Sequence, residues 1–267
     1  MSGPVTFVVF GLGEAGSRIA ADLAAAGAEV RGFDPADVAT PPGVIRHDEP
    51  DGAVPGATVV MAVTAAVDAQ KAIAQAWERI ARGTIYADLS TAPPSLKEDL
   101  HDTASLRGMR FVDVALMATV PGRGLATPAY ASGPGAEPFA EIVNPLGAKV
   151  EVLGPEPGRA ATRKLLRSVL MKGIASLLVE AMEAAEAAGE LNWYWDHIAH
   201  IVTEADEDLL MRLVKGTETH ATRRRQEMEA TAQMLEILEV EPTMTRSTAE
   251  VLRRVERAGL PDYMSGR

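Results

Sequence analysis

Three glycines near the N-terminus have the spacing of a nucleotide-binding loop. They form the pattern G-x-G-x-x-G between a predicted strand at 6–10 and a predicted helix at 15–27. The first glycine of such a pattern permits a tight turn, the second lets the backbone approach a pyrophosphate, and the third lets the helix pack closely on the strand. The free N–H groups and the dipole at the start of the helix then favour the phosphates. We therefore expect six residues to hold a dinucleotide: Gly11, Leu12, Gly13, Glu14, Ala15 and Gly16.

An acidic residue ends the next predicted strand, 28–34. Asp34 follows Gly16 by eighteen residues, where a carboxylate can accept hydrogen bonds from both adenosine ribose hydroxyls and repel a 2′-phosphate. Pro35 and Ala36 come next, in place of an arginine that would bind this phosphate. The pattern favours NAD over NADP as the cofactor. The alternative is a turn-forming aspartate that precedes a proline.

A basic segment at 163–173, with the sequence RKLLRSVLMKG, offers side chains for proton transfer. A lysine can donate or accept a proton when burial lowers its pKa toward neutrality. Lys164, Ser168 and Lys172 are four residues apart, so they share one face of a helix. The opposite side carries three apolar residues that we expect to join a core: Leu166, Val169 and Leu170. The alternative is an ordinary solvated face at the start of a helix. Lys172 could bind an anionic group of the substrate, take over the proton transfer, or extend along the edge of a dimer.

The first half of the chain alternates β-rich runs with helical ones. Helices are expected at 15–27, 68–82 and 95–106, and strands at 6–10, 28–34, 57–63, 84–90, 110–116, 128–133 and 149–154. Such alternation implies right-handed crossovers and a mostly parallel sheet that is covered by helices. We therefore predict an α/β fold with a doubly wound, Rossmann-type sheet over residues 1–157.

The pattern changes at about residue 158, after which no further strand is expected. Helical periodicity runs from 160 to 189, and further helices are expected at 193–215, 218–239 and 243–258. Residues 158–267 should thus form an all-α domain for substrate binding and dimerisation. A central helix of this length needs a partner packed along it, and a second subunit is the natural candidate.

Composition narrows the class of protein. The 267 residues are 47% hydrophobic and 24% charged, as in a globular protein, and the net charge of −11 disfavours nucleic acid as a partner. The absence of cysteine excludes disulfides and thiol catalysis, and His197 and His200 lack the neighbours of a metal site. The sequence has neither a leader pattern nor a membrane-spanning apolar run. We expect a cytoplasmic protein with a small-molecule substrate and no metal.

Four segments follow one another in an order that is typical of a known superfamily. They are FGLGEAGSRIAADLAAAG (10–27), YADLSTAPP (86–94), FVDVALMATVPGRGLATPAYASGP (111–134) and RKLLRSVLMKGIASLLVEAMEAAEAAG (163–189). With them the chain resembles the β-hydroxyacid dehydrogenases and 6-phosphogluconate dehydrogenases, as a short and poorly characterised branch. The resemblance implies a Rossmann domain, a helical domain joined to it by a long central helix, and homodimers in which this helix packs against the partner.

The resemblance assigns roles to a D-x-S-T segment, which here spans residues 88–91. In the family this segment lies by the nicotinamide, so Ser90 is expected to contact substrate and Thr91 the cofactor. Thr64 is expected at the cofactor as well. The alternative for the hydroxyls of Ser90 and Thr91 is a turn that caps the helix beginning near Pro94.

The resemblance also places the family's catalytic lysine at Lys164, because the family's glutamate sixteen residues further on corresponds to Glu180. Ser168 then stands where the family has an asparagine. Met117 and Thr119, with Ala118 between them, replace a Ser-Gly-Gly segment that binds a substrate carboxylate. These departures remove familiar substrate contacts, so they put any specific hydroxyacid substrate in doubt.

The helical half offers further substrate contacts. Trp193, in LNWYWDHIAH, could form an apolar wall over the substrate, or it could be buried between helices or between subunits. His220 and Arg223 are three residues apart in a basic helical cluster that could bind a carboxylate or phosphate. The alternative for this cluster is a salt-bridged surface.

Together these features predict an NAD(P)-dependent dehydrogenase or reductase that acts on a small alcohol or carbonyl compound. Lys164 would be its proton donor and acceptor, assisted by Ser168. Two alternatives remain open: an imine-type reductase of the same architecture, and a nucleotide-binding sensor or scaffold without turnover.

Overall fold

The protein divides into two compact units. The structure, a computed structural model, describes residues 5–261. The boundary between the units lies between Arg167 and Ser168, inside helix α6. No helix among residues 5–261 is both long and apolar enough to cross a membrane.

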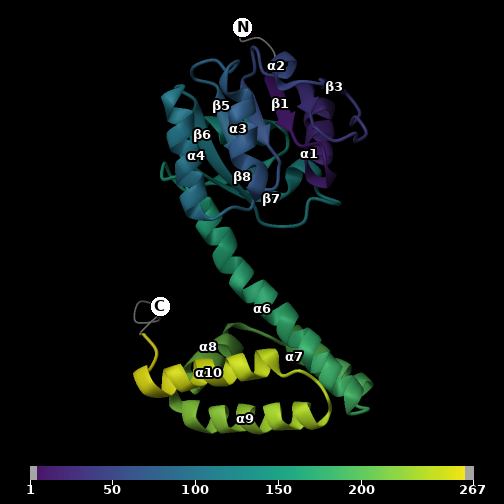
Figure 1. Ribbon diagram of the computed structural model, residues 1–267, viewed down its shortest axis with the longest axis vertical. Coiled ribbons are helices and arrows are strands. Elements are labelled where there is room, and N and C mark those ends of the chain that lie inside the picture. Colours follow the sequence, from purple (N-terminus) through teal and green to yellow (C-terminus); the bar gives the residue numbers. More distant parts are fainter. Residues whose placement is uncertain (1–4, 262–267) are drawn as a thin grey trace. The chain divides into compact units, whose positions relative to one another are not determined.

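The first unit is built on one eight-stranded sheet in the order β3-β2-β1-β4-β5-β6-β7-β8 (Figure 1). All neighbouring strands are parallel except β7, which runs antiparallel to β6. The strands are β1 (Thr6–Phe10), β2 (Glu29–Phe33), β3 (Val44–Arg46), β4 (Val59–Ala62), β5 (Ile85–Asp88), β6 (Arg110–Leu116), β7 (Pro128–Ser132) and β8 (Lys149–Val152). This topology confirms the predicted doubly wound, mostly parallel sheet. The short strand β3 was not predicted.

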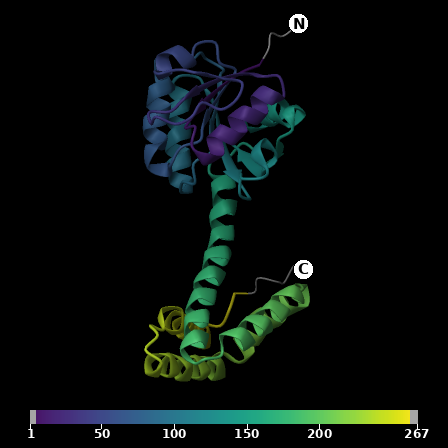
Figure 2. The same cartoon turned by 90° about the vertical axis from the view of Figure 1, so that its right-hand side faces the viewer.

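Helices cover both faces of this sheet, so its central strands are buried on both sides, as apolar runs such as TFVVF predict. The helices are α1 (Glu14–Ala25), α2 (Pro50–Ala53), α3 (Ala69–Trp77), α4 (Pro94–Leu106) and α5 (Ala136–Val143), with 3-10 turns η1 (Ala66–Asp68), η2 (Gly124–Ala126) and η3 (Asn144–Leu146). Residues of α1 and α5 share one apolar core, and residues of α3 and α4 share the other. Figure 2 shows α1 in purple on the side of the sheet opposite to the blue helices.

From Arg159 to Ala258 the regular secondary structure is entirely helical. The helices are α6 (Arg159–Ala187), α7 (Leu191–Thr203), α8 (Glu207–Thr219), α9 (Ala221–Ile237) and α10 (Thr243–Ala258). The single helix predicted at 193–215 is wrong, because two helices with a break at Glu204–Asp206 replace it. Asp206 caps the second of them, since its side chain accepts a hydrogen bond from the Leu209 N–H at 2.8 Å. An aspartate followed by two acidic residues is a helix-start signal that the sequence already carried.

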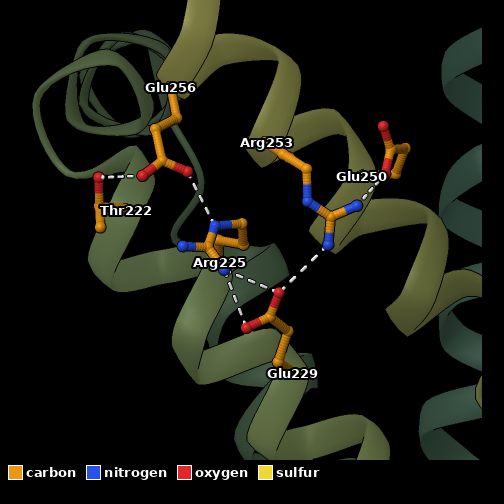
Figure 3. A network of polar contacts seen from close by, with 6 residues as sticks. All are labelled: Thr222, Arg225, Glu229, Glu250, Arg253 and Glu256. Carbon is orange, nitrogen blue, oxygen red and sulfur yellow. Dashed lines mark hydrogen bonds and ion pairs between the residues drawn. The ribbon is translucent and has the colours of Figure 1, made fainter.

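In the second unit, α9 and α10 pack side by side through an apolar seam that buries Leu235, Leu252 and Val255. An ionic network spans the same pair of helices. Figure 3 shows Arg225 of α9 between Glu229 and Glu256, with N···O distances of 2.8 Å to each carboxylate. Thr222 donates to Glu256, and Arg253 bridges Glu229 and Glu250.

The buried carboxylate of Glu180 caps the N-terminus of α10. Its Oε2 accepts from the Met244 N–H at 2.6 Å, and its Oε1 accepts from the Thr245 N–H at 2.8 Å and the Thr245 hydroxyl at 2.6 Å. A carboxylate at a helix start satisfies N–H groups that have no partner within the helix. Glu180 thereby ties the last turns of α6 to α10.

Much of the apolar surface of α6, α7 and α8 is exposed. The prediction that Leu166, Val169 and Leu170 join a core is wrong for the single chain, since their exposed fractions are 66%, 75% and 61%. Helices α7 and α8 bury none of their residues. Periodicity predicted the helices correctly, but it could not show whether the covering surface belongs to the same chain.

Candidate functional site

The glycine loop has the geometry that its sequence pattern predicts. Gly11 has a φ of +88°, and a Cβ added there would lie 2.4 Å from the Val63 carbonyl oxygen. A Cβ on Gly16 would lie 1.9 Å from the Gly11 carbonyl oxygen, so only glycine lets α1 pack this closely on the turn. A Cβ on Gly13, in contrast, meets nothing within 4 Å in the described part of the chain. The space at the second glycine is thus open, as a bound pyrophosphate requires.

Helix α1 begins directly at this loop. It starts at Glu14 with Gly13 as its N-cap, and no side chain caps it. The first N–H groups of an uncapped helix, together with its dipole, suit an anion. The Glu14 side chain does not fill this space, because 72% of it is exposed and it lies 3.9 Å from Arg18.

Asp34 lies beside the loop, at the end of β2. Its Oδ2 accepts a hydrogen bond from the Leu12 N–H at 2.7 Å, and its Oδ1 accepts one from the Ala36 N–H at 2.9 Å. Each carboxylate oxygen has further acceptor capacity, so ribose hydroxyls can still donate to it. Arg46 of β3 holds the turn from outside, by donating to the carbonyl oxygens of Asp34 at 2.7 Å and Ala36 at 3.0 Å. Sequence reasoning missed this arginine, because the short strand that carries it was not predicted.

The loop and Asp34 border a common cavity of about 270 Å³. Its lining also includes Thr64 from the end of β4, and Lys71 and Gln75 from α3. The Thr64 hydroxyl oxygen is buried and has no hydrogen-bond partner among residues 5–261. A buried hydroxyl of this kind calls for a partner, and a polar group of a bound ligand would supply one. The lining residues therefore fit the adenosine and pyrophosphate end of a dinucleotide.

A second polar cluster lies in the sheet at β5, β6 and β7. Asp88, Asp113 and Ser132 occupy paired positions on these three adjacent strands, so their side chains point to the same face. The side chain of Lys97, on α4, contacts both aspartates of this row of paired residues. Its Nζ lies 2.6 Å from Asp88 Oδ2 and 3.1 Å from Asp113 Oδ1, and the exposed fraction of all four residues is zero.

The D-x-S-T segment begins in this cluster. The Ser90 hydroxyl is buried and donates to Asp88 Oδ2 at 2.7 Å, whereas Thr91 is exposed. Burial raises the pKa of the neighbouring Tyr86 phenol, and the Asp88 carboxylate raises it further. Tyr86 therefore stays neutral, and the formal charges of the cluster are those of Lys97 and the two aspartates.

The first turn of α6 is hydrogen-bonded to the same cluster. The Ala160 N–H donates to Ser132 Oγ at 3.0 Å, and the Ala161 N–H donates to Asp113 Oδ2 at 2.8 Å. The Arg163 guanidinium lies 5.0 Å from the centroid of the Tyr130 ring of β7. Lys164 is half-buried on α6, three and four residues after the two anchored alanines and hence on their side of the helix.

The first unit therefore holds most of the residues that the sequence proposed. Met117 is half-buried after β6, where its N–H donates to the Pro128 carbonyl oxygen at 2.8 Å. Thr119 is exposed, and its hydroxyl accepts from Arg123 at 3.2 Å. For Met117 and Thr119, contact with a substrate stays a prediction.

The other predicted residues belong to the second unit. Ser168 is half-buried and Lys172 is exposed on α6. Trp193 is 61% exposed and stacks on the His197 ring at 5.3 Å. The remaining two residues lie at the junction of α8 and α9: His220, which is exposed, and Arg223, which lies 3.4 Å from Glu227. For Arg223 the observed contact is the salt-bridged surface that the sequence left open as an alternative.

Sequence reasoning missed Lys97 and Asp113. Asp113 carried a signal, because a charged residue inside the apolar run FVDVAL has to be paired when the strand is buried. Lys97 carried none, since PSLKEDL reads as an ordinary surface helix. Its partners are brought to it by the order of the strands.

Comparison with protein families divides the chain much as the structure does. Residues 6–150 match the NAD binding domain of 6-phosphogluconate dehydrogenase. Residues 185–255 match a domain of unknown function, DUF1932. The first match covers more than half of the chain.

Individual relatives match over a larger part of the chain. An uncharacterized 28.5 kDa protein from Methanothermus fervidus is 26% identical over 188 residues, which are 69% of this chain and 70% of that protein. A solved protein of unknown function, described as structurally similar to 3-hydroxyacid dehydrogenases, is 26% identical with a TM-score of 0.60, covering 96% of this chain and all of that one. The imine reductase from Myxococcus stipitatus in complex with NADP+ is 18% identical with a TM-score of 0.79, covering 95% of each chain, and a variant of it is in complex with NAD+. At this identity the imine reductase shares the fold alone.

Proposed function

Because the chain belongs to the family that carries the NAD binding domain of 6-phosphogluconate dehydrogenase, we propose that it is a nicotinamide-dependent oxidoreductase. Its substrate would be a small alcohol or the corresponding carbonyl compound. The observation that carries the proposal is the open space at Gly13, between an uncapped helix start and the Asp34 carboxylate. When bound, the nicotinamide cofactor supplies the hydride acceptor or donor.

NAD is the cofactor that Asp34 favours. Its carboxylate lies at the end of β2, where it can accept hydrogen bonds from ribose hydroxyls and where a 2′-phosphate would meet a negative charge. Lys71 in the cavity lining is the group that could oppose this preference. Fluorescence titration with NADH and with NADPH tests it, and tighter binding of NADPH would refute the role of Asp34.

Two glycine variants test the site itself. Gly13→Ala adds a methyl group to open space at a residue with a φ of −64°, so the fold should survive while the pyrophosphate is excluded. We expect NADH affinity to fall by about tenfold or more, about 1.4 kcal/mol. Gly16→Ala is the matched control, because its methyl group would collide with the Gly11 carbonyl and destabilise the unit itself. Unchanged NADH binding by a folded Gly13→Ala variant would refute the cofactor site.

For proton transfer we propose the Nζ of Lys164. Oxidation of an alcohol requires that its hydroxyl proton leaves as the hydride does, and the reverse reaction returns a proton to the carbonyl oxygen. A positioned lysine can do both. Its half-buried place one turn after the anchored start of α6 supports this role. Ser90, and the second-unit residues Ser168 and Lys172, are the groups that we propose to contact the substrate.

Lys164 and Lys172 form a matched pair for testing this assignment. A panel of 2-alkyl-3-hydroxyacids, sugar acids and aldehydes would first identify a substrate. Lys164→Ala should then lower kcat by about 10²- to 10⁴-fold, the usual contribution of a general acid or base, without loss of NADH binding. Lys172→Ala should act mainly on KM. A Lys164→Ala variant with wild-type kcat would refute the assignment, and the same loss in Lys172→Ala instead would transfer the role to that residue.

The same substrate panel distinguishes two other functions. The shared fold of the imine reductases favours adding cyclic imines to the panel, and turnover of an imine without turnover of any alcohol or carbonyl would establish that alternative. Binding of NADH without turnover of any compound would favour a nucleotide sensor or scaffold.

A homodimer is part of the proposal. The exposed apolar residues of α6 and the unburied helices α7 and α8, with Trp193 and Trp195 about 60% exposed, need a covering surface that a second copy of the chain would supply. Sedimentation should give about twice the mass of the chain. Val169→Asp should shift it to the monomer, whereas the same change at Val67, which is exposed in the first unit, should leave the dimer intact. A wild-type monomer would refute this part.

A further inference from the structure

The cluster at β5–β7 connects two parts of the proposed active site that are far apart in sequence. We infer that Asp113 and Lys97 are positioning residues, which fix the first turn of α6, and with it Lys164, relative to Ser90. The inference rests on the proposed function for its effect on turnover, but its structural part is independent of any substrate.

Asp113 holds the helix with a carboxylate whose two oxygens both face donors. Oδ1 faces the Lys97 ammonium at 3.1 Å, and Oδ2 accepts from the Ala161 N–H at 2.8 Å and from the Ser132 hydroxyl at 3.4 Å. Ser132 in turn accepts from the Ala160 N–H. The first N–H groups of a helix have no partner within it, so these two side chains supply what the start of α6 lacks. The negative charge of Asp113 also complements the helix dipole.

Lys97 joins this anchor to the segment that carries Ser90. Its Nζ lies 2.6 Å from Asp88 Oδ2, and the same oxygen accepts from the Ser90 hydroxyl. The Lys97 ammonium also donates to the Asp88 carbonyl oxygen at 3.1 Å. Because none of these groups is exposed, water does not compete for their hydrogen bonds. One ammonium thus fixes the distance between Ser90 and the start of α6.

The residue before α6 lies close to the start of α4. A Cβ added to Gly158, which has a φ of +83° just before α6, would lie 3.1 Å from both Cβ and O of Pro94. Pro94 is the first residue of α4, the helix that carries Lys97. The start of α6 is therefore held by the sheet and by α4 together, and Lys164 follows it by one turn.

The two aspartates differ in a way that separates positioning from general stability. Neither Asp88 Oδ1 nor Asp113 Oδ1 has a hydrogen-bond partner among residues 5–261, but Asp113 Oδ1 lies 3.1 Å from the Lys97 ammonium. An asparagine at 88 can therefore direct its NH₂ group to the side of Oδ1 and keep its oxygen toward Lys97 and Ser90. An asparagine at 113 must direct its NH₂ group either to the Lys97 ammonium or to the Ala161 N–H. Both are donors, so one contact is lost in either orientation. Asp88→Asn and Asp113→Asn therefore make the same chemical change in one buried row, but only the second breaks the path of contacts from Lys97 through Asp113 to the first turn of α6.

Hydrogen exchange measured by mass spectrometry on the full chain tests the structural part. In Asp113→Asn, amides in a peptide that covers residues 159–167 should exchange about tenfold faster or more, which corresponds to about 1.4 kcal/mol of opening free energy. Peptides of β1 and α1 should not change, and in Asp88→Asn the 159–167 peptide should stay within about twofold of wild type. Equal exchange in both variants, or faster exchange throughout the sheet, would overturn the inference.

Kinetics with a substrate from the panel test the functional part. Asp113→Asn should lower kcat by about a hundredfold, since a displacement of about 1 Å can cost that much, while NADH affinity stays at the wild-type value. A wild-type kcat with a loosened α6 would overturn the positioning role. Failure of the proposed function is distinguishable, because it would show as wild-type turnover in Lys164→Ala whatever the exchange of the 159–167 peptide.

Discussion

The protein contains two ionic networks with similar groups in opposite surroundings. In the first unit, Lys97 joins Asp88 and Asp113 with no exposure to solvent. In the second unit, Arg225 joins Glu229 and Glu256 across α9 and α10, where the side chains are 20%, 40% and 31% exposed (Figure 3). The first network connects helix α4 with strands β5 and β6, whereas the second connects one helical pair.

Burial determines what each network contributes. A charge taken out of water has to be compensated completely, so the loss of one partner in the first network leaves the others uncompensated. The exposed network gains little from each pair, because water and salt screen it and the free side chains are well solvated. The comparison therefore predicts large, local effects in the first network and small, salt-sensitive effects in the second.

The largest effect should follow from Lys97→Met. It keeps the length of the side chain but leaves two buried carboxylates without the ammonium, which should cost about 3–5 kcal/mol of unfolding free energy. Lys149→Met, on exposed Lys149 of β8, is the control and should stay within about 0.5 kcal/mol. Urea denaturation followed by circular dichroism measures both. Equal unfolding free energies of the two variants would mean that the buried network does not stabilise the fold.

This contrast also explains what could be predicted from the sequence. The alternation of strands and helices, the glycine loop and Asp34 are local patterns, and the observed sheet and the contacts of Asp34 agree with them. The network around Lys97 depends on the register of β5, β6 and β7 and on the docking of α4. No local pattern encodes these, so Lys97 was not recognised, and the position of Asp113 in an apolar run did not identify its partner.

The helical half shows a different limit. Periodicity predicted α9 and α10 well but merged α7 with α8, because it gave no weight to Asp206 as a cap. It also assigned Leu166 to a core from its spacing alone, although 66% of this residue is exposed. A helix can have the correct apolar spacing and still leave its covering surface to another molecule. For residues such as Ser168 and Lys172, the role of each stays a prediction.

An intermediate effect should follow at Glu180, which is buried but is compensated by backbone N–H groups instead of a charge. Glu180→Gln turns an NH₂ group toward the N–H of Met244 or Thr245, so one donor at the start of α10 is left without its acceptor. The expected loss is about 1–3 kcal/mol. Glu183→Gln, at an exposed position on the same helix, should change little. Faster hydrogen exchange at residues 243–247 in the first variant only is the expected result, and equal exchange in both would refute the capping role.

The smallest effect should come from acid acting on the exposed network. Hydrogen bonds from Arg225 lower the pKa of both Glu229 and Glu256 in the folded protein. A lowered folded pKa means that the contribution to stability is complete above the unfolded value of about 4.3 and is lost as the pH falls through the folded pKa. Wild type should therefore lose more stability than Arg225→Met between about pH 5 and pH 3. Because the groups are partly exposed to solvent, the difference should shrink at about 1 M salt, where the screening length is about 3 Å. If the difference in stability loss between wild type and Arg225→Met persists at high salt, this network is as poorly screened as the buried one, and the contrast between the two networks is refuted.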